Sequence, residues 1–256
     1  MEPNSIDEVI GALDAIIDRA WTERDRIGYF AALYRRVTRS VRDGITSGRF
    51  QNAPLLEKLD VVFARRFLDA LFAHQNAGEP SKSWQVAFRA CANAQPLIVQ
   101  QLLMGMNAHI NLDLGIASVE TSPGAALPLL KPDFDQINGL LAEQVGTVEI
   151  EIAGISPRIG DLEKLGCQTT TGAIINFDLT VARDAAWLFA ERLAMQPRLL
   201  ADAFIDARDL AVSIFGASLL VPIACAPLQP IRDAECNDVR QVIDVLVGKS
   251  SSAPAR

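Results

Sequence analysis

The sequence is poor in the residues that most often carry out metal and thiol chemistry. Among 256 residues it has only two histidines, His74 and His109, and four cysteines. No two cysteines have the close spacing of a zinc site or of a redox motif. A site with several zinc ions needs more histidines than this chain has, so that class of site is excluded. Reduced thiols are the simplest state of the four cysteines.

Several motifs of well-defined catalytic sites are also missing. The sequence has no Gly-x-x-x-x-Gly-Lys phosphate loop and no Gly-x-Ser-x-Gly nucleophile elbow. It has neither the Asp-Asp-x-x-Asp motif of helical diphosphate-binding cyclases nor the Glu-x-x-His pairs of di-iron bundles. These absences exclude the commonest phosphate-binding, serine-hydrolase and di-iron assignments.

Positive charge is in short supply as well. The formal net charge of −7 makes the chain a poor partner for nucleic acid or for an anionic membrane surface. Residues 211–228 carry no charge, but Pro222 and Pro227 interrupt them, so a buried helix is favoured over a membrane span, with an interfacial segment as the alternative. The polar, acidic start of the chain does not resemble a secretory signal. We expect a cytoplasmic protein with no integral membrane segment, and homo-oligomer formation stays open.

Helical spacing of apolar residues dominates what is present. It predicts helices that include residues 54–74, 97–117, 174–194, 197–220 and 236–247. Residues 148–152 alternate like a strand but stand alone, so we interpret them as part of a helix. The sequence therefore predicts an all-α fold: one domain over residues 1–248, with eight to ten helices packed round the apolar helix 97–117, and a disordered tail over residues 249–256.

The helix 97–117 carries four polar residues in an otherwise apolar stretch. His109 and Asp113 are four residues apart and share one face, and Asn107 and Asn111 form a second such pair. A helix that is apolar nearly all round is surrounded by others. The two pairs must then face a cavity or polar partners, because unpaired polar groups are costly to bury.

His109 and Asp113 are the candidate catalytic pair. Asp113 would orient the imidazole, and His109 would act as general acid or base because its pKa lies near neutral pH. In a second interpretation, both side chains ligate a single divalent metal from one helix face. In a third, they only hydrogen-bond each other and orient the core. Asn107 and Asn111 either contact a substrate or tie helices together.

Other candidates follow from aromatic and charged residues at helical spacing. Trp84 could line a substrate pocket, and Arg183 or Asp184 could face a cavity lined by Trp187. The alternatives are a core position for Trp84 and a solvated ion pair beside a core Trp187. For the charges of the helix 54–74, the default expectation is surface pairing; these residues are Glu57, Asp60, Arg65 and Arg66.

Two resemblances add to this interpretation. The pattern Gly105-x-x-x-His109-x-x-x-Asp113 is similar to the helical metal-binding stretch of zinc-dependent phospholipase C and single-strand nuclease proteins, which are all-α. Those sites need several further histidines, which this chain lacks. Over roughly residues 26–195 the chain also resembles an uncharacterised helical family, a domain of unknown function found in bacteria and some fungi. That resemblance implies an all-α domain and no activity, and it rests on the segments Tyr29–Thr38, Trp84–Phe88, Gly105–Leu114 and Ala182–Trp187.

Together these observations predict an enzyme that acts on a small, largely apolar molecule in a cavity between helices. Its reaction would be acid/base proton transfer, such as isomerisation, cyclisation, elimination or hydrolysis. The alternative is a non-catalytic helical protein that binds a lipid-like ligand or a partner helix, and a third interpretation is a single-metal hydrolase. We expect no cofactor, with a divalent metal at His109 and Asp113 as the minor alternative.

Overall fold

The computed structural model describes residues 2–164, 178–220 and 228–249, and within these ranges every regular element is a helix. The first five are α1 (Ile6–Glu23), α2 (Ile27–Thr46), α3 (Ala53–Gln75), α4 (Lys82–Ala92) and α5 (Ile98–Ala108). Next come the π-helix η1 (His109–Asp113), α6 (Leu114–Thr121), the 3₁₀ helix η2 (Gly124–Leu130), α7 (Lys131–Ile155) and the 3₁₀ helix η3 (Ile159–Lys164). The remaining helices are α9 (Leu179–Ala194), α10 (Arg198–Leu220), α11 (Gln229–Arg232) and α12 (Val239–Leu246). The predicted all-α fold is confirmed.

Local sequence signals explain where several helices begin. The side chains of Ser5, Asn52, Ser81 and Asp178 each accept a hydrogen bond from a backbone N–H in the first turn of α1, α3, α4 and α9, respectively. Pro54 stands in the first turn of α3, where its missing N–H costs nothing. Residues 148–152 continue α7, as expected from their isolation.

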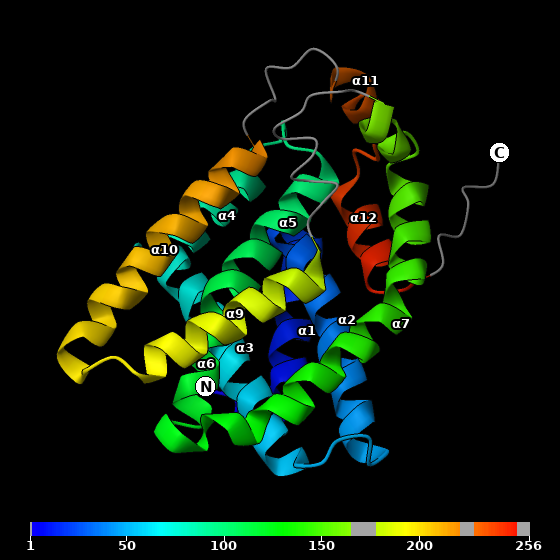
Figure 1. Ribbon diagram of the computed structural model, residues 1–256. Helices are drawn as coiled ribbons and strands as arrows, with labels where there is room; N and C mark the ends of the chain where they lie inside the picture. The colour runs from blue at the N-terminus through cyan, green and yellow to red at the C-terminus, as the bar shows by residue number, and fades with distance from the viewer. Residues whose placement is uncertain (1, 165–177, 221–227, 250–256) are drawn as a thin grey trace.

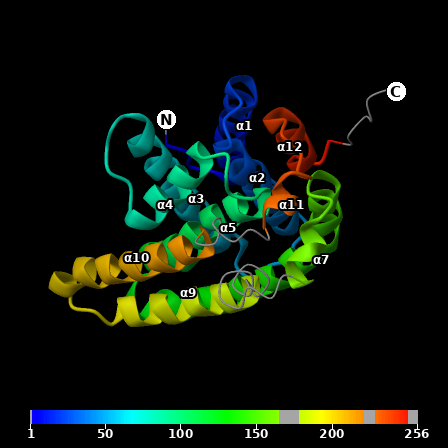
Figure 2. The same ribbon diagram turned by 90° about the horizontal axis from the view of Figure 1, so that it is seen from above.

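The segment α5–η1–α6 runs through the interior of the molecule (Figures 1 and 2). It packs against α2, α3 and α4 on one side and against α9 and α10 on the other. One apolar cluster joins α5 to α1–α4 and α12, and a second joins α6 to α3, α7 and α9. The segment is thus enclosed by helices from both halves of the chain, which is what its nearly all-round apolar surface requires.

Several sequence-based boundaries differ from the structure. The predicted helix 97–117 extends from Ile98 to Thr121 and contains a π segment in its middle. The last helix is shorter than 236–247, because Asp238 caps its first turn. The start of the predicted helix 174–194 and tail residues 250–256 lie outside the described residues.

Two further observations concern the cysteines and the membrane. Cys91 and Cys236 are free thiols, whereas Cys167 and Cys225 lie outside the described ranges. Within the described part of the chain, no helix combines the length and the hydropathy needed to cross a bilayer.

Candidate functional site

A π-helical turn brings His109 and Asp113 together. The backbone N–H of Leu114 donates to the carbonyl of His109, five residues earlier, which defines the π turn over His109–Asp113. Within it, His109 Nδ1 lies 3.1 Å from Asp113 Oδ2, and both side chains are almost fully buried. Single π turns inside α-helices occur frequently at functional sites. The predicted pairing of the two residues is therefore present, in a backbone conformation that the sequence pattern did not indicate.

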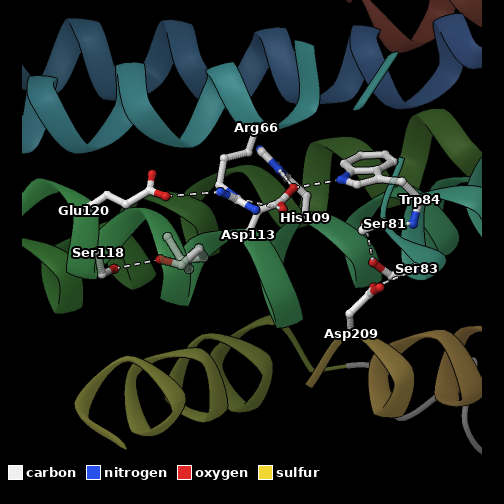
Figure 3. Close-up of polar contacts among 10 residues, drawn as sticks. Arg66, Ser81, Ser83, Trp84, His109, Asp113, Ser118, Glu120 and Asp209 are labelled. Carbon is white, nitrogen blue, oxygen red and sulfur yellow. Dashed lines mark hydrogen bonds and ion pairs between the residues drawn. The ribbon is translucent and has the colours of Figure 1, made fainter. Parts of the chain in front are cut away.

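Asp113 is held by donors from two other helices (Figure 3). Arg66 Nε of α3 donates to Asp113 Oδ1 at 3.1 Å, and Trp84 Nε1 of α4 donates to Oδ2 at 2.8 Å. Arg66 also reaches Glu120 Oε1, at 3.3 Å. The Asp113 carboxylate accepts from Arg66 and Trp84, and we assign it the same role toward His109, so that Nδ1 carries the proton that faces Asp113. The other ring nitrogen, Nε2, then has the free lone pair.

The imidazole of His109 is enclosed by aromatic rings. It stacks on Phe63 with ring centroids 3.6 Å apart, and Tyr34 meets its edge at 4.6 Å. Burial lowers the pKa of His109, while the hydrogen bond and the charge of Asp113 act in the opposite direction. Nε2 is buried and has no hydrogen-bond partner among the described residues. The result is a neutral, oriented imidazole with one unused acceptor.

His109 lies in the wall of a cavity of about 740 Å³. This volume is in the range of small-molecule sites. Side chains from α2, α3, α5, η1, α7 and α9 line it, and most of them are apolar; they include Leu33, Tyr34, Phe63, Leu103, Met106, Ile137, Leu141, Val148 and Ile152. The polar side chains in the wall include His109, Asn138 and Arg183. The cavity thus combines an apolar lining with a few polar groups.

Arg183 belongs to this wall and is buried. Its Nε donates to Asn138 Oδ1 and its Nη2 to the Phe134 carbonyl, both at 2.6 Å. The alternative of a solvated ion pair at Arg183 is wrong, because the side chain is buried and forms no ion pair within the described ranges. The neighbouring Trp187 lies outside the cavity lining, where it packs on Phe134 and donates to Glu191.

The remaining predicted site residues serve internal contacts. Trp84 is a core residue whose indole N–H is used by Asp113. Asn111 Nδ2 donates to Asn107 Oδ1 at 3.0 Å, and Asn107 Nδ2 donates to the Val212 carbonyl of α10 at 3.0 Å. All three lie outside the lining of the cavity. Their contact with a substrate stays a prediction.

Sequence reasoning missed Arg66, Phe63 and Tyr34. Arg66 was assigned to surface pairing, yet it holds the buried Asp113. The signal available in the sequence was its position on α3: it lies three residues after Phe63 and four before Ala70, in a stripe of apolar side chains. Asp60, also assigned to the surface, is buried and forms no ion pair with a described residue.

The donor set around His109 is a poor match to a metal site. Within the described ranges, no three His, Cys, Asp or Glu side chains gather closely enough to hold an ion. Both Asp113 oxygens already accept hydrogen bonds. A cation would have to displace Arg66 or Trp84 to reach that carboxylate.

Comparison with known proteins places the chain in a family. Residues 6–222 match the model of a family of unknown function, DUF5995. The comparison with curated proteins found no match, and the comparison with solved structures found none. The match covers most of the chain, and the expected membership of an uncharacterised helical family is confirmed. The chain therefore belongs to the DUF5995 family, and its described residues form an all-helical domain.

Proposed function

We propose that this protein is an enzyme that binds a small, largely apolar molecule in the cavity and transfers a proton with His109. The observation that carries the proposal is the unpartnered Nε2 of an imidazole in the cavity wall, whose Nδ1 is held by Asp113. A buried acceptor without a partner is unfavourable unless a ligand supplies one.

The local electrostatics suit a general base. Burial lowers the pKa of His109, so the ring is neutral at pH 7 and Nε2 accepts a proton. Asp113 stabilises the imidazolium that forms, because its carboxylate accepts from Nδ1. The protonated Nε2 can then return the proton to another atom of the ligand. Isomerisation, elimination and cyclisation all fit this sequence of steps, and hydrolysis fits if water is admitted.

Chemical modification tests whether Nε2 is open to a ligand. His74→Gln leaves His109 as the only histidine of the chain. We expect diethyl pyrocarbonate to modify His109 in the folded His74→Gln protein, since the reagent attacks a neutral imidazole nitrogen. Peptide mass spectrometry locates the adduct. If His109 reacts only after unfolding with urea, the cavity gives no access to Nε2 and the proposal fails.

Turnover is tested with a small-molecule extract of the source cells in D₂O. We expect the wild type and His74→Gln either to consume a compound of the extract or to incorporate deuterium from the solvent into it. His109→Gln should lower this activity at least about 10²-fold. Activity should decline on the acid side because protonation removes the base, and this decline should lie at a lower pH than for an ordinary histidine, because burial lowers the pKa of His109. A compound that is retained by the wild type but never converted would favour the non-catalytic binding protein instead.

A further inference from the structure

The second unusual group in the cavity wall is the guanidinium of Arg183. Its residue is 5 % exposed, and the plane of the group lies over the Phe134 ring, with Cζ 4.3 Å from the ring centroid. Burial lowers its pKa to about 10, which still leaves it charged at neutral pH. A buried cation is costly unless an anion or several acceptors compensate it.

The positive charge of Arg183 is only partly compensated by other groups of the protein. Nε and Nη2 donate to two neutral acceptors, Asn138 Oδ1 and the Phe134 carbonyl. Nη1 forms no hydrogen bond or ion pair with any described residue. Asp135 and Asp184 act on Arg183 only through space and do not pair with it. One edge of the guanidinium is therefore unused.

The other charged side chains of the cavity wall, Asp178 and Glu149, are exposed. Asp178 Oδ1 is used to cap α9, where it accepts from the backbone N–H groups of Thr180 and Val181. The buried part of the wall thus carries one cation, Arg183, beside the neutral His109 and Asn138.

We propose that the cavity takes a carboxylic acid with an extended apolar body and that Arg183 holds its carboxylate. This inference rests on the proposed function and names its substrate class. A carboxylate matches the planar edge of a guanidinium, and its single negative charge equals the one buried cation. The apolar body lies against the aliphatic and aromatic lining, where the same ligand can reach His109. A doubly charged phosphate monoester would leave a buried negative charge uncompensated.

The test compares three ten-carbon probes by isothermal titration calorimetry below their aggregation concentrations: decanoate, decan-1-ol and decyl phosphate. We expect the wild type to bind decanoate about tenfold or more tightly than decan-1-ol, and no less tightly than decyl phosphate. Arg183→Met removes the charge and keeps an apolar side chain. It should abolish the preference for decanoate and change the affinity for decan-1-ol less than about threefold.

Two controls separate this inference from the proposed function. His109→Gln should keep the preference for decanoate, because the carboxylate is assigned to Arg183; loss of the preference in that variant would overturn the assignment. Equal binding of decanoate and decan-1-ol by the wild type would overturn the inference and leave the proposed function standing. Failure of all three probes to bind would count against both. If Arg183→Met does not fold, the comparison of decanoate with decan-1-ol in the wild type still tests the inference.

Discussion

At the residue scale, Asp113 connects three elements of the fold. It accepts hydrogen bonds from His109 in η1, Arg66 in α3 and Trp84 in α4. Asp113 is 2 % exposed, so its charge is compensated almost entirely by these donors. The orientation of His109 and the packing of α3 and α4 on η1 therefore depend on one carboxylate.

The first prediction follows from this arrangement. Asp113→Asn should lower the free energy of unfolding by about 3 kcal/mol, because the amide places a donor against donors and leaves Arg66 without its buried partner. Urea denaturation measures the change. Glu120→Gln is the matched control, because it removes the other carboxylate that contacts Arg66. The Glu120 side chain is 51 % exposed, so this substitution should change the free energy of unfolding by less than about 1 kcal/mol. Equal effects of the two substitutions would contradict the special position of Asp113.

Asp60 is another buried carboxyl group, and it lies outside the cavity lining. Burial, with a smaller contribution from Glu57, raises its pKa from 3.8 to about 7, and Asp60 Oδ2 has no partner among the described residues. An acid with a raised pKa in the folded state binds more protons there than in the unfolded chain. The contribution of Asp60 to stability is therefore lost as pH rises from about 4 to about 7.

We expect Asp60→Asn, which resembles the protonated acid, to gain stability relative to the wild type over this range. The difference should grow by up to roughly 3 kcal/mol between pH 4 and pH 7 and then level off. Urea denaturation of both proteins across a pH series measures it. Asp18→Asn, at an exposed position on α1, is the matched control in the same series. A difference for Asp60→Asn that does not change with pH would show that folding leaves the pKa of Asp60 unchanged, and would contradict the prediction.

At the scale of elements, close approach determines how the segment α5–η1–α6 packs. A Cβ atom on Gly105 would lie 2.5 Å from Phe30 Cγ, and one on Gly115 would lie 2.5 Å from Phe189 Cδ1. At these positions α2 lies close to α5 and α9 lies close to α6. Phe30 in turn packs edge-on against the imidazole of His109, with ring centroids 5.6 Å apart.

Gly105→Ala should therefore destabilise the protein by about 1–3 kcal/mol, because Phe30 has to move in a packed core. Gly11→Ala is the control, since Gly11 is also helical but a Cβ there meets nothing within 4 Å. That substitution should stabilise by about 0.5–1 kcal/mol through higher helix propensity. Thermal unfolding of both variants measures the two changes in melting temperature. Changes of the same sign would refute the predicted difference between the two glycines.

At the scale of the whole molecule, carboxylates from distant segments cap the starts of internal helices. Asp209 of α10 accepts from the backbone N–H groups of Lys82 and Ser83 at the start of α4, at 2.7 and 2.9 Å. Figure 3 shows Asp209 beside Ser83. Glu235 accepts in the same way from the backbone N–H of Ile98 of α5, and also from the Ser156 hydroxyl. These contacts join the second half of the chain to the first.

We expect Asp209→Ala to lower the free energy of unfolding by about 1–2 kcal/mol, because two N–H groups at a helix start lose their acceptor. Asp206→Ala, on an exposed position of the same helix, should have an effect below about 0.5 kcal/mol. Chemical denaturation compares the two. If both substitutions have the same small effect, water replaces the carboxylate and α10 contributes little through this contact.

Much of the architecture follows from local properties of the sequence. Apolar residues at helical spacing predicted the helices. The i,i+4 spacing predicted the contacts His109–Asp113 and Asn107–Asn111, because such side chains are neighbours on one helix face. That spacing does not separate an α turn from a π turn, so the π segment was not predicted.

What the sequence alone determined, then, is the helical class of the fold and the pairs that lie within one helix, since both depend on residues a few positions apart. Only the tertiary structure decided that Arg66 and Trp84 hold Asp113, that Phe63 stacks on His109 and that Arg183 shares a cavity with His109. These contacts join residues far apart in sequence. Their cause is the burial of apolar helix faces, which positions whole helices and so brings the attached polar groups together.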